Sequence, residues 1–142
     1  MDLTTSYVFD AAHRIAGHPG KCAWLHGHTY HLEVTVSSPT LNALGMVMDF
    51  DDLGDVVQKA VLGLWDHATL LAADDPLGPA ISAVQREAPD RVVLLPGHPT
   101  AEVLTREAWT RLESQLPAGI ALERVAIRET PSCGSAISRP KT

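Results

Sequence analysis

Apolar and polar positions alternate with a period of two in two stretches near the start of the chain. In residues 3–13 the odd positions are apolar, aromatic or β-branched and end on His13, and in residues 26–36 the even positions begin with His26 and His28. This period is typical of β-strands, whose successive side chains point to opposite faces. The pattern therefore predicts two strands, one ending in His13 and one presenting His26 and His28 on a single face, with a loop rich in Gly and Pro between them.

A helical period replaces this alternation further along the chain. Apolar residues between positions 53 and 64 recur at helical spacing behind Asp49, which is a suitable N-cap. A second helix is predicted after Thr100, with apolar positions between 104 and 112 facing inward and an end near Pro117. Between the two helices we predict a loop over residues 74–79, a short helix over 81–88 and a buried extended piece over 92–95.

Two further strands are predicted near the end of the chain. Val125, Ile127 and Glu129 share one face of the first, and residues 135–138 return as the second after a turn over 131–134. The order of elements favours one α+β domain over residues 1–142, with a four-stranded antiparallel sheet and two main helices on one face. Such a sheet has open edges, which predicts edge-to-edge association into a closed oligomeric barrel.

Composition narrows the class of protein. The chain has 142 residues, 45% of them hydrophobic, and 11 Lys and Arg against 17 Asp and Glu give a formal charge of −6. The few basic residues are scattered, which argues against a nucleic-acid partner. No apolar run approaches the roughly 20 residues of a membrane span, and the first residues do not resemble a signal peptide, so we expect a cytoplasmic protein without a membrane partner. Its two cysteines are expected to be thiols.

Histidines are concentrated in the first strands, where five of seven fall within residues 1–31. If the two strands are neighbours, three imidazoles, those of His13, His26 and His28, can converge on a zinc ion and leave a fourth position open, as in catalytic sites. Two alternatives stay open. The histidines could be ordinary polar strand residues, or Cys22 could join His26 and His28 in a structural Cys-x-x-x-His-x-His site.

Other residues could carry chemistry beside these histidines. A metal or Lys21 nearby would favour the thiolate of Cys22, which could then act as a base or nucleophile; the alternative is an inert surface thiol. Asp66 and His67 could form a proton relay, although a His at a helix C-terminus is also favoured by the helix dipole. Two carboxylates are further candidates. An inward Glu129 needs a partner or a ligand, whereas Glu102 in a first helical turn is favoured by the helix dipole.

Six motifs together resemble the 6-pyruvoyl-tetrahydropterin synthase and 6-carboxytetrahydropterin synthase family over nearly the whole chain. They are Phe9-Asp10-Ala11-Ala12-His13, Cys22-Ala23-Trp24-Leu25-His26-Gly27-His28, Met48-Asp49-Phe50, Asp66-His67, Pro99-Thr100-Ala101-Glu102 and Glu129-Thr130. The resemblance implies the tunnelling fold (T-fold), in which trimeric barrels stack into a hexamer with active sites at subunit interfaces. The Cys-x-x-x-His-Gly-His spacing is similar to that of the bacterial 6-carboxytetrahydropterin synthases of queuosine and 7-deazapurine pathways.

The resemblance also implies roles for single residues. It makes His13, His26 and His28 zinc ligands, Cys22 the catalytic base, and Asp66 with His67, from an adjacent subunit, the rest of a proton relay. It makes Glu129 the anchor of the pterin ring, with Thr100 and Glu102 near that pocket. The implied enzyme is a zinc-dependent lyase that converts 7,8-dihydroneopterin triphosphate to 6-carboxy-5,6,7,8-tetrahydropterin, acetaldehyde and triphosphate.

Departures from the family pattern keep other functions open. Val103 stands where the family usually has Asn after the Glu, and Cys133 and Gly134 follow the Glu129 segment. One alternative is an enzyme that forms a pyruvoyl pterin or cleaves dihydroneopterin, and another is a zinc-stabilised pterin-binding module without turnover. Arg14, Lys21 and Arg128 are candidates for binding the triphosphate.

Overall fold

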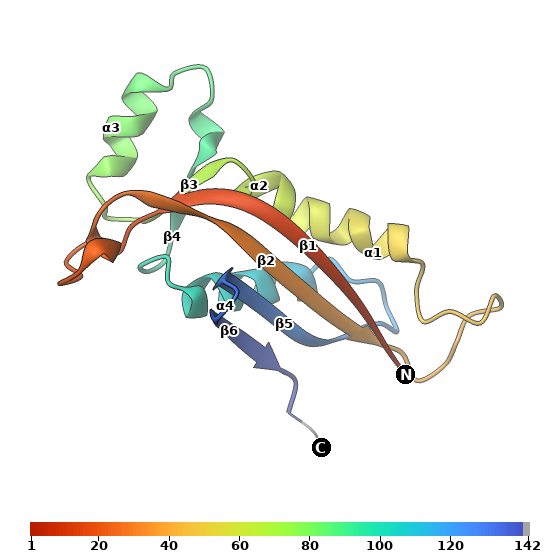
Figure 1. Ribbon diagram of the computed structural model, residues 1–142. Helices are drawn as coiled ribbons and strands as arrows, with labels where there is room; N and C mark the ends of the chain where they lie inside the picture. The colour runs from red at the N-terminus through yellow and green to blue at the C-terminus, as the bar shows by residue number, and fades with distance from the viewer. Residues whose placement is uncertain (141–142) are drawn as a thin grey trace.

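A long antiparallel pair of strands runs through the computed structural model, which describes residues 1–140 (Figure 1). Strand β1 (Asp2–His13) pairs with strand β2 (His26–Ser37) in a continuous register that ends with His13 opposite His26. Buried and exposed positions alternate along both strands. The first two predicted strands are thereby confirmed, and the loop between them contains the short 3-10 helix η1 (Lys21–Ala23).

In the described residues, six strands form one sheet in the order β4-β3-β1-β2-β5-β6. Strand β5 (Ala121–Thr130) pairs antiparallel with β2, and β6 (Cys133–Ser138) pairs antiparallel with β5, as predicted. On the other edge of β1 the sheet gains two short parallel strands, β3 (Ala68–Ala72) and β4 (Val92–Leu95). The sheet is therefore mixed, not purely antiparallel as expected. Almost every residue of β3 is buried, and such a strand shows no alternation from which to predict it.

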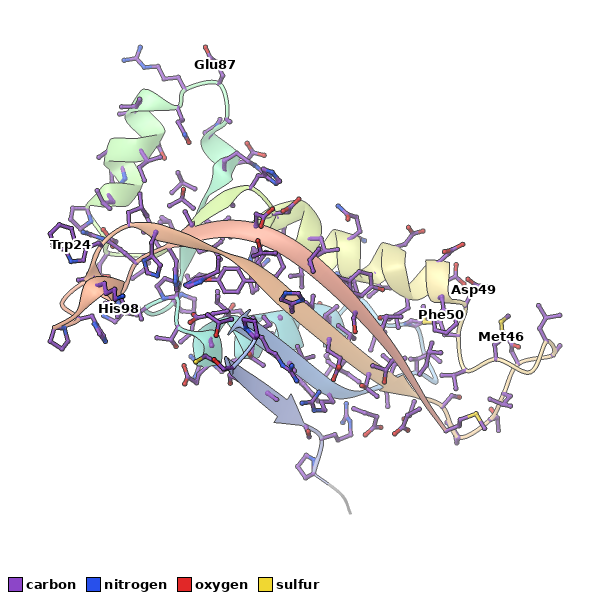
Figure 2. The ribbon with its side chains drawn as sticks, in the orientation of Figure 1. Trp24, Met46, Asp49, Phe50, Glu87 and His98 are labelled. Atoms are coloured by element: carbon purple, nitrogen blue, oxygen red, sulfur yellow. The ribbon has the colours of Figure 1, made fainter. Side chains whose placement is uncertain are left out.

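Two helical stretches pack against one face of this sheet. The first joins α1 (Phe50–Val57), the π-helical segment η2 (Gln58–Leu62) and α2 (Gly63–Trp65), and the second is α4 (Ala101–Glu113). The predicted caps are confirmed, because the Asp49 carboxylate accepts from the amide of Asp51 and the Thr100 hydroxyl from that of Val103. Figure 2 shows Asp49 and Phe50 at the start of α1.

The third helix, α3 (Leu77–Val84), begins earlier than the helix predicted over 81–88. The Asp75 carboxylate accepts from the amide of Leu77, and the Asp75 carbonyl accepts from the amide of Gly78, so a turn forms where a loop was expected. The 3-10 helix η3 (Pro89–Arg91) then leads into β4.

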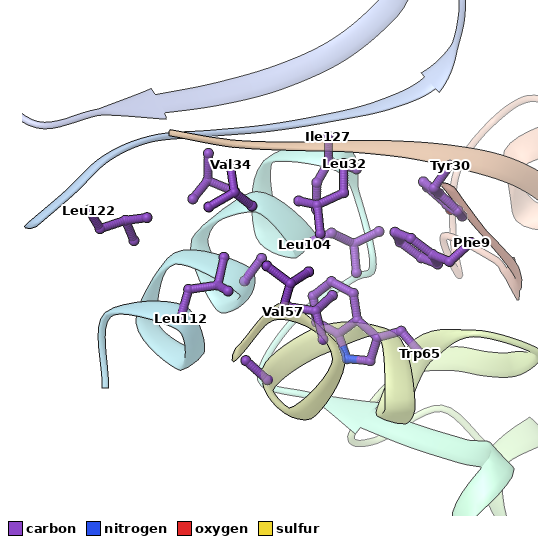
Figure 3. Close-up of a cluster of buried hydrophobic side chains, with 14 of the residues drawn as sticks. Phe9, Tyr30, Leu32, Val34, Val57, Trp65, Leu104, Leu112, Leu122 and Ile127 are labelled. Atoms are coloured by element: carbon purple, nitrogen blue, oxygen red, sulfur yellow. The ribbon is translucent and has the colours of Figure 1, made fainter. Parts of the chain in front are cut away.

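The core fills the space between the sheet and the helices (Figure 3). Its largest fully buried side chains come from both layers: Phe9, Tyr30, Leu32, Leu53, Trp65, Leu70, Leu104, Leu112, Leu122 and Ile127. Burying each such apolar side chain contributes about 1.5–3 kcal/mol, and this fixes which face of each strand points inward. The opposite face is largely exposed over β1 and β2, including Val8, which is 60% exposed, whereas α3 contacts β4 at its edge.

Candidate active site

Three histidines meet on the inner face of the sheet, where β1 ends and β2 begins. The register sets His13 opposite His26 and Ala11 opposite His28, so all three imidazoles project to the same side. Their ring centroids lie 4.6 to 5.1 Å apart, and one ligand nitrogen from each lies within 4.8 Å of the others. The structure thus brings together the three predicted metal ligands, which we call the histidine triad.

Backbone carbonyls fix the tautomers of two of these rings. The Nδ1 atoms of His13 and His26 lie 2.7 Å from the carbonyl oxygens of Pro99 and Trp24. A carbonyl only accepts, so each Nδ1 carries the proton and each Nε2 presents a bare lone pair. The two Nε2 atoms face each other at 3.2 Å. At this distance two bare nitrogens need a metal cation or a shared proton between them.

The donor set suits a tetrahedral metal. Two nitrogens bound to one zinc ion at about 2.0–2.1 Å in tetrahedral geometry lie about 3.3 Å apart, close to the 3.2 Å between the Nε2 atoms of His13 and His26. Burial lowers the pKa of His13 to about 4, with smaller contributions from its two His neighbours. His13 is therefore neutral near pH 7, the form in which imidazole binds metals.

Cys22 lies in η1, half-buried, in the loop that joins β1 to β2. Its carbonyl accepts from the amide of Ile15, which closes the loop. Within residues 1–140, the cluster of ligand atoms at the histidine triad does not include the Cys22 sulfur. This arrangement does not support the alternative of a structural site with Cys22 as the fourth ligand. Trp24 and His98 lie at the same end of the sheet (Figure 2).

Asp66 and His67 lie between α2 and β3, beside β1, and their side chains meet that of Asp10 on the other face of the sheet. His67 Nδ1 is 3.0 Å from Asp66 Oδ1, and the same carboxylate oxygen accepts from the amide of Asp10 at 2.9 Å. The Asp10 carboxylate accepts in turn from the Thr29 hydroxyl. Asp10 and Thr29 are opposite each other and one position away from His28 and Ala11, so they point to the uncovered face. Within one chain the sheet therefore separates the Asp66–His67 pair, which we call the dyad, from the histidine triad.

The dyad is held mainly through its backbone. His67 has a φ of 59°, a left-handed conformation, and its amide donates to the Asp10 carbonyl at 2.6 Å. The guanidinium of Arg91 donates to the carbonyl of Asp66 and, less closely, to that of Gly63. The amide of Asp10, and after it His67, hold the pKa of Asp66 below its usual value, so this carboxylate stays ionised.

The remaining predicted site residues surround the start of α4 and the end of β5. Thr100 is the N-cap of α4 and follows Pro99, whose carbonyl holds His13. Glu102 is exposed in the first turn, where it also suits the helix dipole. Glu129 is half-buried on β5, and its charge, after burial itself, raises the pKa of Tyr30.

Two features of this region were missed by sequence reasoning. The guanidinium of Arg14, a candidate for the triphosphate, donates twice to the buried Asp75 carboxylate at 2.6 and 2.8 Å. Arg14 is therefore already paired, whereas Lys21 and Arg128 are exposed. The second feature is the contact of Asp10 with the dyad. Both depend on pairing between distant segments, and no local pattern signals them.

The fold and the triad define an α+β protein with three histidines that could hold a metal ion at the end of its central hairpin. Residues 2–140 match the family model described as 6-pyruvoyl tetrahydropterin synthase, and the chain belongs to this family. It is 34% identical over 136 residues to a 6-carboxy-5,6,7,8-tetrahydropterin synthase of Rickettsia felis, covering 94% of this chain and 96% of that relative. A probable enzyme of the same name from Halobacterium salinarum is 39% identical over 124 residues, 86% of this chain and 76% of that relative.

Solved structures show the same fold at lower identity. An uncharacterised protein of Wolinella succinogenes superposes with a TM-score of 0.82 at 21% identity and covers 99% of this chain and 98% of its own. The 6-pyruvoyl tetrahydropterin synthase of Caenorhabditis elegans gives a TM-score of 0.70 at 20% identity, over 99% and 96%. The predicted T-fold is confirmed. In residues 1–140, no helix has the length and apolar character needed to cross a membrane.

Proposed function

We propose that this chain is a 6-carboxy-5,6,7,8-tetrahydropterin synthase. The observation that carries the proposal is the pair of bare Nε2 atoms of His13 and His26 at 3.2 Å, with His28 beside them, in a chain whose relatives carry this name. The reaction would convert 7,8-dihydroneopterin triphosphate to 6-carboxytetrahydropterin, acetaldehyde and triphosphate. In this proposal the enzyme is cytoplasmic and feeds queuosine or other 7-deazapurine synthesis.

His13, His26 and His28 would hold a zinc ion through their nitrogens. When bound, zinc supplies Lewis acidity that polarises the side-chain hydroxyls of the substrate. The chain's own contribution is preorganisation: the carbonyls of Pro99 and Trp24 orient two rings before any metal arrives. Three protein ligands leave one position open, as catalysis requires and a structural site does not.

Cys22 would act as the catalytic base, and the dyad would complete the proton relay. Because His67 Nδ1 donates to Asp66, its Nε2 is free to accept a proton from a neighbouring group. The dyad lies on the uncovered face of the sheet and cannot reach the triad of its own chain through the strands. We therefore propose that His67 and Asp66 serve the Cys22 of an adjacent subunit, within a hexamer built from two trimeric barrels.

Glu129 would anchor the pterin ring. An ionised carboxylate can accept two parallel hydrogen bonds from a ring N–H and an exocyclic amine, which offsets the cost of its partial burial. Thr100 and Glu102, at the start of α4, would border the same pocket. The effect of the Glu129 charge on Tyr30, whose ring is met edge-on by His28 of the triad, supports this arrangement.

The test is incubation of zinc-loaded protein with 7,8-dihydroneopterin triphosphate, with acetaldehyde and the pterin product measured by mass spectrometry. We expect equal amounts of acetaldehyde and 6-carboxytetrahydropterin. A pyruvoyl pterin, or glycolaldehyde from the dephosphorylated substrate, would replace the proposal by one of its enzymatic alternatives. No turnover with zinc bound, together with binding of the pterin, would indicate a pterin-binding module.

A further inference from the structure

Two aromatic side chains cross the inner face of the sheet next to the histidine triad. The register places Phe9 of β1 opposite Tyr30 of β2, and directly opposed side chains on one face lie within contact range of each other. Strand β5 lies on the other side of β2, and their register ends with His31 opposite Arg128, one residue short of Tyr30 and Glu129. At this point β5 is irregular against β6, between Arg128 and Thr130. Tyr30 and Glu129 therefore adjoin the last β2–β5 pair, and the carboxylate assigned to the pterin is near enough for its charge to act on Tyr30.

The Tyr30 hydroxyl has no evident structural purpose in the free protein. The residue is 0% exposed, and among residues 1–140 its hydroxyl finds no hydrogen-bond partner. The ring is held in place, stacked on Phe9 at 5.0 Å and met edge-on by His28 at 5.5 Å. A buried hydroxyl without a partner destabilises a fold, and phenylalanine would fill the same space without that cost.

Glu129 is the movable member of the pair. Its side chain has three rotatable bonds and is half-buried, whereas the Tyr30 ring is fixed by its neighbours. A carboxylate has about four acceptor positions, of which a pterin edge would use two. We propose that Tyr30 is a positioning residue for the pterin: when ligand binds, its hydroxyl donates to the Glu129 carboxylate and fixes the plane of that group. This inference rests on the proposed function and adds a residue to it.

The first experiment compares Tyr30→Phe with the zinc-loaded wild type. We expect an unchanged or higher unfolding temperature, unchanged zinc content, and a KM raised about 10- to 100-fold, the range for loss of a hydrogen bond to a charged group. The kcat should change little, because Cys22 and the triad are intact. The matched control is Thr5→Val, which removes another buried, unpartnered hydroxyl from β1 away from the histidines. It should leave KM unchanged.

The second experiment is a double-mutant cycle with Glu129→Ala, read by titration of neopterin fluorescence. Tyr30→Phe should weaken neopterin binding in the wild type and add almost nothing in the Glu129→Ala background. Additive effects, a wild-type KM for Tyr30→Phe, or a lowered unfolding temperature, which would reveal a structural partner, would each overturn the assignment. Wild-type protein that binds neopterin without turnover would refute the proposed reaction but still decide the role of Tyr30. Wild type that does neither would refute both.

Discussion

The two clusters that could carry chemistry lie on opposite faces of the same sheet and differ in burial, in hydrogen bonding and in what surrounds them. The histidine triad is on the core side, with His13 1% exposed and two rings tied to backbone carbonyls. The dyad is on the uncovered side, where the side chain of His67 is 75% exposed and that of Asp66 43%. The triad is therefore assembled by one chain alone, whereas the dyad is oriented but has nothing in its own chain to act on.

This difference shows that one polypeptide is sufficient to assemble the triad but gives the dyad no group to act on. The triad needs only the β1–β2 register and two carbonyls, so it forms as soon as the sheet and α4 pack. The dyad is also ordered in advance, by Asp10, Arg91 and a left-handed His67, although it faces outward. A left-handed backbone kept at an exposed position is what the proposed function requires of an imidazole that serves an adjacent subunit. A second copy of the chain is the simplest such molecule for the proposed enzyme.

Replacing a triad ligand should have the largest effect. In His26→Ala the remaining two imidazoles cannot close a stable site, so we expect zinc content to fall to near zero and turnover to fall by roughly a thousandfold or more. Metal analysis and the acetaldehyde assay test this directly. His31→Ala is the matched control, because His31 is on the same strand and points to the other face. Zinc retained by His26→Ala would show that the triad is not the metal site.

Cys22→Ala separates the base from the metal site. We expect turnover to drop by on the order of 10²–10⁴, the range for general base catalysis, with zinc content unchanged. Cys133→Ala should keep full activity, although the hydroxyls of Thr130 and Ser132 lower the pKa of its thiol. If Cys22→Ala instead loses zinc, the sulfur is a metal ligand and Cys22 belongs to the triad's cluster.

Mixing two inactive variants tests whether the clusters belong to different chains. Cys22→Ala and His67→Ala are each expected to be inactive. If every site takes Cys22 from one subunit and His67 from another, random co-assembly restores an intact pair in about one quarter of sites. Equal amounts are unfolded together, refolded and assayed, with each variant refolded alone as the control. No recovered activity in mixed oligomers would place both residues in the same chain.

The sequence predicts the fold best where side chains alternate. Strands β1 and β2 alternate between more and less buried positions, and β6 alternates between half-buried and exposed ones. Helices α1 and α4 have capping residues at Asp49 and Thr100. Strand β3 has no exposed face, so its pattern cannot be told from any other buried segment. The early start of α3 depends on the Asp75 side chain, which a pattern of apolar residues does not reveal.

In the candidate site too, features that depend on local sequence could be predicted and features that depend on distant strand pairing could not. The convergence of the histidine triad follows from strand parity and a hairpin, both of which are local. The separation of His67 from the triad and the closeness of Glu129 to Tyr30 depend on the β1–β3 and β2–β5 registers. Those registers join segments far apart in the sequence, and no single stretch of residues specifies them.

The Arg14–Asp75 ion pair lies next to the triad, because Arg14 directly follows His13. Breaking it tests how much this pair stabilises the fold beside the triad. Removing one partner of a buried ion pair costs about 3–5 kcal/mol, so Asp75→Asn should lower the free energy of unfolding by about that much at pH 7. Urea unfolding measures it. Glu113→Gln, at the exposed pair with Arg139, is the control and should cost less than about 1 kcal/mol.

The destabilisation caused by Asp75→Asn is expected to depend on pH. Hydrogen bonds from Arg14 hold the pKa of Asp75 below its usual value. The unfolded chain then binds this proton more readily than the folded one, so the pair's stabilisation is complete above the ordinary carboxyl pKa of about 3.9 and is lost as pH falls through the lower folded value. The stability difference between wild type and Asp75→Asn should be constant from pH 7 to about 5 and shrink below about 4. A difference that grows in acid would contradict the pairing.

The smallest loss of stability is expected from a substitution at Thr100. It tests whether zinc binding by the triad depends on the N-cap of helix α4. Thr100→Ala removes the N-cap of α4 and should cost about 1 kcal/mol of unfolding free energy, with Thr100→Ser restoring most of it. The Pro99 carbonyl that holds His13 belongs to the backbone and stays in place, so zinc affinity should remain close to that of the wild type. Asp49→Ala, the N-cap of α1, gives a matched loss at a helix that does not touch the triad. If Thr100→Ala weakens zinc binding and Asp49→Ala does not, the start of α4 is part of the metal site itself.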